Sequence, residues 1–262
     1  MATTYTHQRF ADECAKALSG DALRAVENRR GLYITGAHGP DILFYYHAQL
    51  PGRVSALGSR LHRESARGFF ENARLVWNTH ADREGMLAYL LGFLTHFALD
   101  SSVHGFVNGE HAALGVSHNR LEAVWDARLM LRDGLRPSGV FRGAELEPTA
   151  ENAALIAPFF GLTAKRTLAA LRGQERVMRL LYAPDEKKRR ALRAAIRLSR
   201  LPGGFDDLFI DDEIPPELDA ALDELDARYA AALAEFPGMA SALRARLEGK
   251  AELPERFDRD FG

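Results

Sequence analysis

Cysteine is almost missing from this sequence, in which Cys14 is the only one among 262 residues. A single cysteine cannot form an internal disulfide, and such usage is typical of proteins in a reducing compartment. The first ten residues, MATTYTHQRF, contain no basic segment followed by an apolar run, so no secretory signal is visible. From these features we expect a cytoplasmic protein.

An excess of charge and a hydrophobic run of membrane length are also lacking. The formal net charge is −2, which favours neither nucleic acid nor a membrane as a partner of the whole chain. The longest apolar stretch, near Leu87 to Leu99, is too short to span a bilayer and contains His96. We therefore expect no stable nucleic-acid complex and no transmembrane segment.

Runs of β-branched residues are scarce, whereas apolar residues recur at steps of three and four. This pattern predicts an all-α fold, and the length suits a single domain over residues 1–262. The segment 81–106 is apolar on most faces, which predicts a buried central helix. Further helices are expected at 8–18, 21–30, 53–78, 117–133 with Ser117 as N-cap, 149–171, 174–182, 185–201 and 215–248.

Histidine is absent after residue 118, and all nine histidines lie at or before that position. An even distribution would place about half of them later in the chain. The chemistry is therefore expected within residues 1–126, and the helices of residues 149–262 are expected to complete the core.

Two sets of side chains with metal-ligand spacing lie on neighbouring predicted helices. His96, Asp100 and His104 follow one another at intervals of four, and His118 and Glu122 are also four apart. Four residues along an α-helix, the next side chain lies about 40° round and about 6 Å on, so each set shares one face. Imidazole and carboxylate suit a zinc-type cation, and a carboxylate in an apolar helix is costly unless it is paired. The alternative is a buried histidine–carboxylate network without metal.

The other candidate ligands are weaker. Asp41 follows Gly-Pro in the segment GAHGPD, where an aspartate more often stabilises a turn. His7 and His62 have no local signal of their own. Four more histidines are interpreted as loop or solvent residues, although the first of them is three residues from Asp41 and could line a pocket: His38, His47, His80 and His111.

A basic run extends from Lys187 to Arg197 and gathers Arg189, Arg193 and Arg200 on one side of a predicted helix. Such a face could contact phosphate-bearing polymers or anionic lipid. We favour the simpler interpretation of a solvated face. Its charge would be balanced by the acidic residues that follow, namely Asp206, Asp207, Asp211, Asp212 and Glu213.

The ordered set of candidate ligands resembles that of the zinc-dependent bacterial phospholipases C, which are related to the single-strand-specific zinc nucleases of fungi. In that family the ligands follow the order His, Asp, His, a His-x-x-x-Asp pair, His, and a His-x-x-x-Glu or His-x-x-x-Asp pair. This chain offers the same order: His7, Asp41, His62, His96, Asp100, His104, His118 and Glu122.

The resemblance implies two or three zinc ions. The first would be held by Asp41, His62, His96 and Asp100, the second by His104, His118 and Glu122, and the third by His7 and a bridging Asp100. The family also uses an N-terminal tryptophan at the third zinc, whereas this chain starts with Met1. Three residues rather than five separate Asp100 from His104, and Ile42 replaces the tyrosine of the choline-specific members, so a choline cage is not supported.

The function implied is hydrolysis of phosphate esters by water activated on zinc, with a phospholipid headgroup or a soluble analogue as substrate. Asp41 would be catalytic, as a ligand that also orients or deprotonates the attacking water. Two alternatives stay open: a nuclease or nucleotidase with the same metals, and a non-catalytic metal-binding helical protein.

Overall fold

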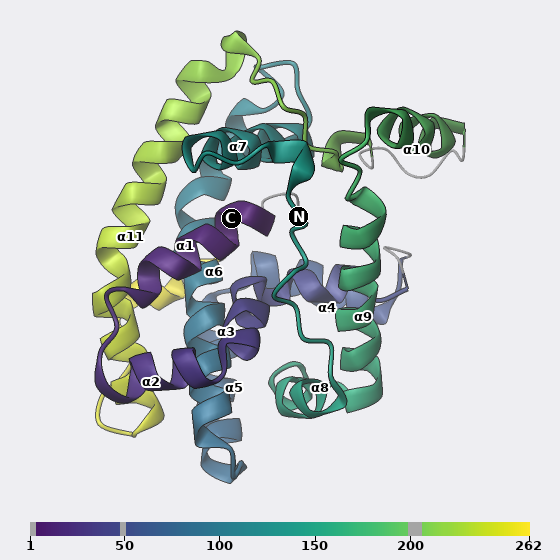
Figure 1. Ribbon diagram of the computed structural model, residues 1–262. Coiled ribbons are helices and arrows are strands. Elements are labelled where there is room, and N and C mark those ends of the chain that lie inside the picture. Colours follow the sequence, from purple (N-terminus) through teal and green to yellow (C-terminus); the bar gives the residue numbers. More distant parts are fainter. Residues whose placement is uncertain (1–3, 48–50, 199–205) are drawn as a thin grey trace.

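The computed structural model describes residues 4–47, 51–198 and 206–262. All regular secondary structure in these residues is helical, which confirms the predicted all-α fold. Residues 199–201 of the expected helix 185–201, which include Arg200, lie outside the described part. Figure 1 shows a central helix, α6, with α11 along one side and α9 along the other.

The helices of the first half end at residue 132. They are α1 (Thr4–Ala15), α2 (Gly20–Asn28), α3 (Arg30–Ala37), the 3-10 helix η1 (Gly39–Tyr45), α4 (Arg53–Arg63), α5 (Ala66–Thr79), α6 (Arg83–Glu110) and α7 (His118–Arg132). The later elements are η2 (Pro137–Gly139), α8 (Ala150–Ile156), η3 (Ala157–Phe160), α9 (Ala164–Leu181), α10 (Glu186–Leu198), η4 (Asp206–Leu208), η5 (Pro216–Leu218), α11 (Asp219–Leu247) and η6 (Glu255–Asp258).

The core is built around α6, as its composition predicts. Every residue from Gly85 to Asp100 is buried, because a helix that is apolar on all faces must be covered on all of them. Its first turn is capped by Asp82, whose carboxylate accepts a hydrogen bond from the Gly85 N–H at 2.8 Å. This helix is long and apolar enough to cross a bilayer, but 89% of its most apolar window is buried within the protein. The core therefore accounts for its hydrophobicity.

Two glycines let α3 and α6 touch backbone to backbone. A Cβ atom at Gly36 would lie 2.2 Å from the Tyr89 carbonyl oxygen, and one at Gly92 would lie 1.9 Å from that of Tyr33. Only glycine fits such a contact. Since η1 begins two residues after α3 ends, the crossing places η1 against the middle of α6.

The observed boundaries differ from the expected ones at three places. The expected helix 53–78 is two helices, α4 and α5, and the second begins after its N-cap Ser65. The expected break near residue 172 is absent, because α9 is continuous and the chain turns earlier, at Gly161 with φ 63°. The segment 31–47 lies outside the expected helices, but most of it belongs to α3 and η1.

Candidate metal centre

The eight predicted ligands lie on five elements: α1, η1, α4, α6 and α7. Their nitrogen and oxygen atoms fall into three groups, and within each group the atoms lie within 4.8 Å of one another. The groups are Asp41, His62 and His96; His7, His96 and Asp100; and His104, His118 and Glu122.

In the first group, His62 and Asp41 face each other with a defined tautomer. His62 Nδ1 donates to the Gly58 carbonyl oxygen at 2.8 Å, since a carbonyl can only accept. Its Nε2 lies 3.0 Å from Asp41 Oδ1. A neutral His62 therefore aims a lone pair at a carboxylate, an arrangement that needs a proton or a cation between them. Burial lowers the pKa of His62, but the hydrogen bond and charge of Asp41 outweigh burial and leave this pKa raised.

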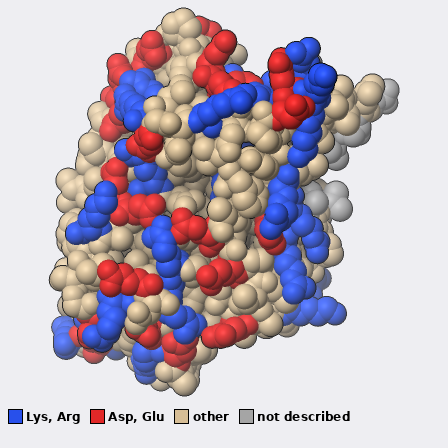
Figure 2. All heavy atoms as spheres, in the orientation of Figure 1, with Lys and Arg blue, Asp and Glu red and all other residues tan. Residues whose placement is uncertain are grey.

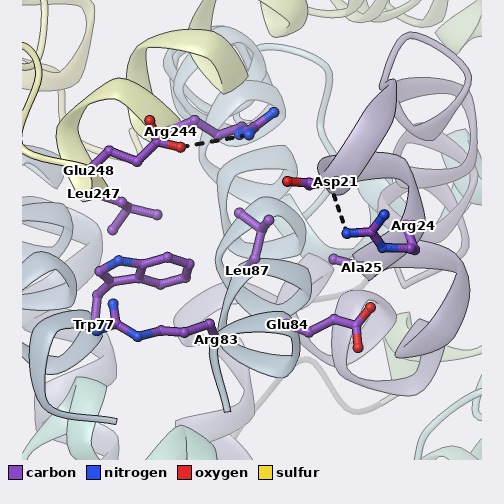
Figure 3. Close-up of a pocket in the computed structure, with 10 residues that line it drawn as sticks. All are labelled: Asp21, Arg24, Ala25, Trp77, Arg83, Glu84, Leu87, Arg244, Leu247 and Glu248. Atoms are coloured by element: carbon purple, nitrogen blue, oxygen red, sulfur yellow. Dashed lines mark hydrogen bonds and ion pairs between the residues drawn. The ribbon is translucent and has the colours of Figure 1, made fainter. Parts of the chain in front are cut away.

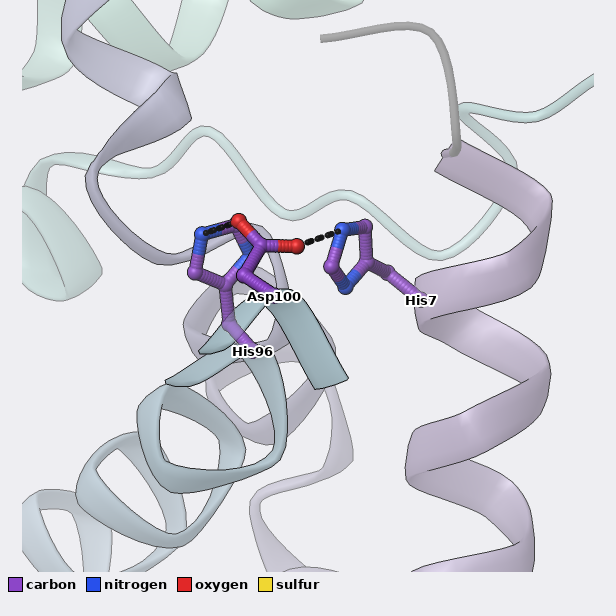
Figure 4. Close-up of side chains that lie close together, drawn as sticks. All are labelled: His7, His96 and Asp100. Carbon is purple, nitrogen blue, oxygen red and sulfur yellow. Dashed lines mark ion pairs between the residues drawn. The ribbon is translucent and has the colours of Figure 1, made fainter. Parts of the chain in front are cut away.

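In the second group, Asp100 lies between two imidazoles, as Figure 4 shows. Its Oδ1 is 3.1 Å from His7 Nε2 and its Oδ2 is 2.9 Å from His96 Nε2. The rings of His7 and His96 are stacked, with centroids 4.5 Å apart. Burial alone would raise the pKa of Asp100, but the charges of His104, His96 and His7 hold it well below the ordinary value.

These short contacts do not have the geometry of ordinary hydrogen bonds. Within the described residues, His7 Nδ1, both ring nitrogens of His96 and Asp100 Oδ1 are buried without a hydrogen-bond partner. Buried polar atoms in proteins are nearly always hydrogen-bonded, so several orphans in one place require another partner. Lone pairs of imidazole and carboxylate that converge without hydrogen-bond geometry fit a zinc-type cation.

The third group lies where α7 meets α6. Ser117 caps α7 by accepting a hydrogen bond from the Arg120 N–H, which confirms the predicted N-cap. Glu122 Oε1 lies 3.2 Å from His104 Nε2 and 3.3 Å from His118 Nε2. Burial would raise the pKa of Glu122, but the two histidines help to hold it well below the ordinary value. Burial lowers the pKa of His104, yet the nearby carboxylates raise it to about 9.

With this geometry in view, comparison with known proteins is informative. A family model of zinc-dependent phospholipase C matches residues 6–171, which is more than half of the chain and contains all eight predicted ligands. The chain belongs to the zinc-dependent phospholipase C family. Comparisons with curated proteins and with solved structures gave no match.

In this member of the phospholipase C family, His38 takes the second of the two places that the sequence left open for it, close to Asp41. It is the C-cap of α3 and is buried rather than exposed to solvent, with Nε2 lacking a hydrogen-bond partner among the described residues. Burial, followed by the charge of His7, lowers its pKa to about 3. The cause is the packing of α3 on α6, which turns the start of η1 inward. His38 therefore adds a neutral imidazole beside the ligands.

Asp126 supports the centre from outside the predicted ligand set. It follows Glu122 by one turn of α7 and accepts hydrogen bonds from the Thr6 N–H at 2.8 Å, the Thr6 hydroxyl at 2.7 Å and the Tyr5 N–H at 3.2 Å. It thereby fixes the first turn of α1 and so positions His7. Burial raises the pKa of Asp126 to about 6, against the charge of Arg142 and the hydrogen bonds. Asp126 continues the four-residue spacing of His118 and Glu122, and this spacing could have indicated it from the sequence.

Gly39 makes room for the His96 ring. Its φ is 50°, and a Cβ atom there would lie 2.1 Å from the ring. Both facts require glycine two residues before Asp41.

Phe261 covers the centre from the far end of the chain. Its ring centroid lies 5.7 Å from that of His62 and 5.8 Å from that of His96, and its N–H donates to the His62 carbonyl oxygen at 3.2 Å. Residue 261 is outside the segment that the family model matches. No local pattern in the sequence could have indicated this contact.

A separate hollow of about 490 Å³ lies at the opposite end of α6 (Figure 3). It is lined by Asp21, Arg24, Ala25, Trp77, Arg83, Glu84, Leu87, Arg244, Leu247 and Glu248. Leu87 and His96 are nine residues apart on one helix, or about 14 Å. Arg83 lies over the Trp77 ring at 4.8 Å, and the other two arginines each pair with a carboxylate of the hollow. This hollow is distinct from the metal centre.

Proposed function

We propose that this protein is a zinc-dependent phosphodiesterase that cleaves phosphate esters of the phospholipid-headgroup type. Family membership supports the coarser class of zinc-dependent phosphoester hydrolase. The observation that carries the proposal is the facing pair of His62 and Asp41, whose lone pairs meet at 3.0 Å and require a cation or a proton between them.

The proposed ligand sets follow the family resemblance, and each overlaps one of the three groups of side chains. Asp41, His62, His96 and Asp100 would hold one ion, and His104, His118 and Glu122 a second. His7 and Asp100 would contribute to a third. Zinc, when bound, supplies an activated water and neutralises charge on the phosphoryl oxygens.

Asp41 is the carboxylate best placed to act on the attacking water. Its side chain is 14% exposed, whereas the side chains of Asp100 and Glu122 are 3% and 1% exposed. Burial would raise the pKa of Asp41, but neighbouring positive charge, including His62, leaves it below the ordinary value. An ionised and accessible carboxylate can orient the water and accept its proton.

A nuclease is the second candidate. Phe44 is half-buried, and its ring lies 5.5 Å from that of His62, where an aromatic side chain could stack on a base. Single-stranded DNA therefore belongs among the substrates to be tested.

The test combines metal content with activity. We expect two to three zinc ions per chain and faster hydrolysis of bis-p-nitrophenyl phosphate and of phospholipid headgroup esters than of single-stranded DNA. His96→Ala should remove zinc and lower activity by about 100-fold or more, because His96 is shared by two groups. His47→Ala, an exposed histidine outside the groups, is the control. Zinc-free protein after gentle purification, or full activity in His96→Ala, would contradict the proposal, and zinc without hydrolysis would favour a non-catalytic role.

A further inference from the structure

The net charge of −2 conceals a strongly basic segment. Residues 164–198 contain eleven Lys and Arg but only three Asp and Glu. These residues form α9 and α10 and the turn between them. Eight of the basic side chains are exposed, and we call them the basic strip: Lys165, Arg166, Arg172, Arg176, Arg179, Lys187, Lys188 and Arg190. Figure 2 shows Lys and Arg side chains running down the edge of the molecule where α9 and α10 lie.

As expected from sequence, acidic residues after α10 balance part of the basic run, because Asp211 pairs with Arg189 at 3.6 Å as well as with Arg193. In the described part of the chain, none of the eight side chains of the strip pairs with these acidic residues. Asp211 pairs with Arg120 at 2.9 Å and with Arg193 at 3.0 Å, on the side of α10 that faces the protein. Asp212 is engaged by Arg136, and Asp207 accepts from Ser117. These carboxylates therefore anchor α10 and leave its outer face cationic.

Most of the strip has no acidic partner among the residues that the structure describes. Arg179 pairs with Glu175, and Arg190 pairs with Glu186. Arg172, Arg176 and Lys187 make no ion pair with a described residue. Since like charges on one surface repel each other, an anionic surface opposite them would be stabilising.

Apolar side chains accompany the charges. Leu180, at the end of α9, is 49% exposed, and Leu198, at the end of α10, is 83% exposed. No aromatic residue occurs among the large hydrophobic side chains exposed in the described part of the chain. Basic residues with exposed leucines suit the headgroup region of a bilayer, whereas binding of single-stranded nucleic acid relies on aromatic stacking.

The strip also lies close to the metal centre. The inner side of α9 packs on η1, where a Cβ atom at Gly173 would lie 2.1 Å from the Tyr45 carbonyl oxygen. Asp41 belongs to the same 3-10 helix. A bilayer on the outer side of α9 would thus be about one helix diameter, roughly 10 Å, from the element that carries Asp41.

We propose that the outer face of α9 and α10 is a docking surface for an anionic phospholipid bilayer. This proposal deepens the proposed function. It rests on that function in one respect, because docking serves to bring lipid headgroups to the metal centre. Docking itself requires no hydrolysis and is measured separately.

The test is sedimentation of the full chain with vesicles. We expect binding to vesicles of phosphatidylcholine mixed with phosphatidylglycerol, weak binding to phosphatidylcholine alone, and release at high salt. Arg172→Glu/Arg176→Glu/Lys187→Glu should lower the partition coefficient by about tenfold or more, given roughly fivefold per basic residue near the surface. Lys16→Glu/Arg63→Glu/Arg259→Glu, with the same charge change at exposed sites on other elements, should change it less than about twofold.

Hydrolysis of bis-p-nitrophenyl phosphate separates docking from catalysis. The strip variant should retain the kcat/KM of the unmodified protein for this soluble substrate. Failure to bind anionic vesicles, equal losses in the two triple variants, or stronger binding of single-stranded DNA that the strip variant abolishes would each overturn the docking proposal. A protein that binds vesicles but hydrolyses no phosphate ester would retain the docking surface and lose the proposed function.

Discussion

Gly39 sets the distance between η1 and the His96 ring, and its replacement tests the centre at the scale of one residue. Gly39→Ala should destabilise the protein by about 2 kcal/mol or more and reduce bound zinc, because a side chain there is strained at positive φ and meets the ring. Urea unfolding and metal analysis measure both effects. Gly68→Ala, in a helix with open space around it, is the control and should not lower stability. An unchanged zinc content in Gly39→Ala would contradict the geometry.

Asp126 gives a second prediction at this scale. Asp126→Asn keeps the shape of the side chain but loses charged acceptors for Thr6 and Tyr5, which should cost about 1–3 kcal/mol. Because α1 then loses its anchor, zinc held through His7 should fall, whereas zinc at His104 and Glu122 should remain. Metal stoichiometry and thermal unfolding measure this outcome. Thr6→Val, which removes one of the three bonds, should have a smaller effect, and full zinc content in Asp126→Asn would exclude the positioning role.

The residue scale also shows which site features the sequence could reveal. Asp100 was recognisable because a carboxylate in an apolar helix needs a partner, whatever the rest of the fold. For His38 the sequence left both a solvent position and a pocket position open, because its burial depends on how α3 packs on α6. Phe261 depends on a contact with His62 across nearly two hundred residues, and periodicity carries no such information. The assignment of individual ligands stays a prediction until zinc is measured.

At the scale of elements, the contact of α3 with α6 controls where η1 lies. Gly92→Ala should destabilise the protein by more than about 2 kcal/mol, since its Cβ atom would lie 1.9 Å from the Tyr33 carbonyl oxygen. Gly105→Ala, on the same helix with nothing within 4 Å, should instead stabilise it by roughly 0.5–1 kcal/mol. Chemical denaturation of the two variants measures the difference, and equal effects would show that the helices do not touch as described.

Helices with strong local signals were predictable from sequence, and boundaries that depend on packing were not. The apolar faces of α6 and the cap at Ser117 are local properties, so the predictions for α6 and α7 are close to the observed bounds. The break at Ser65 and the continuity of α9 through Gly173 depend on tertiary contacts instead. Propensity gives way to packing at such positions.

At the scale of the whole molecule, the unfolding free energy of the zinc-free and zinc-loaded forms should depend differently on pH. Burial lowers the pKa of His104, but Asp100 and Glu122 raise it from 6.5 to about 9. A raised pKa in the folded state stabilises the protein fully below pH 6.5, and this contribution is lost as pH rises through about 9. Chelated protein should therefore lose unfolding free energy across this range. Zinc-loaded protein should not, because zinc requires neutral imidazole and competes better as protons become scarce.

Urea unfolding at several pH values between 6.5 and 9, with and without a chelator, measures this difference. Parallel stability profiles for the two forms would show that zinc does not replace the protons of these histidines.

The position of Phe261 against His62 and His96 has a consequence for biosynthesis. A ribosome makes the ligand-bearing helices long before it makes this phenylalanine, so the nascent chain presents its imidazoles without their aromatic cover. If these histidines hold zinc as proposed, the ion would enter with less obstruction before Phe261 is made. Once the ring is in place, exchange of the ion with the surroundings would require Phe261 to move away from His62 and His96.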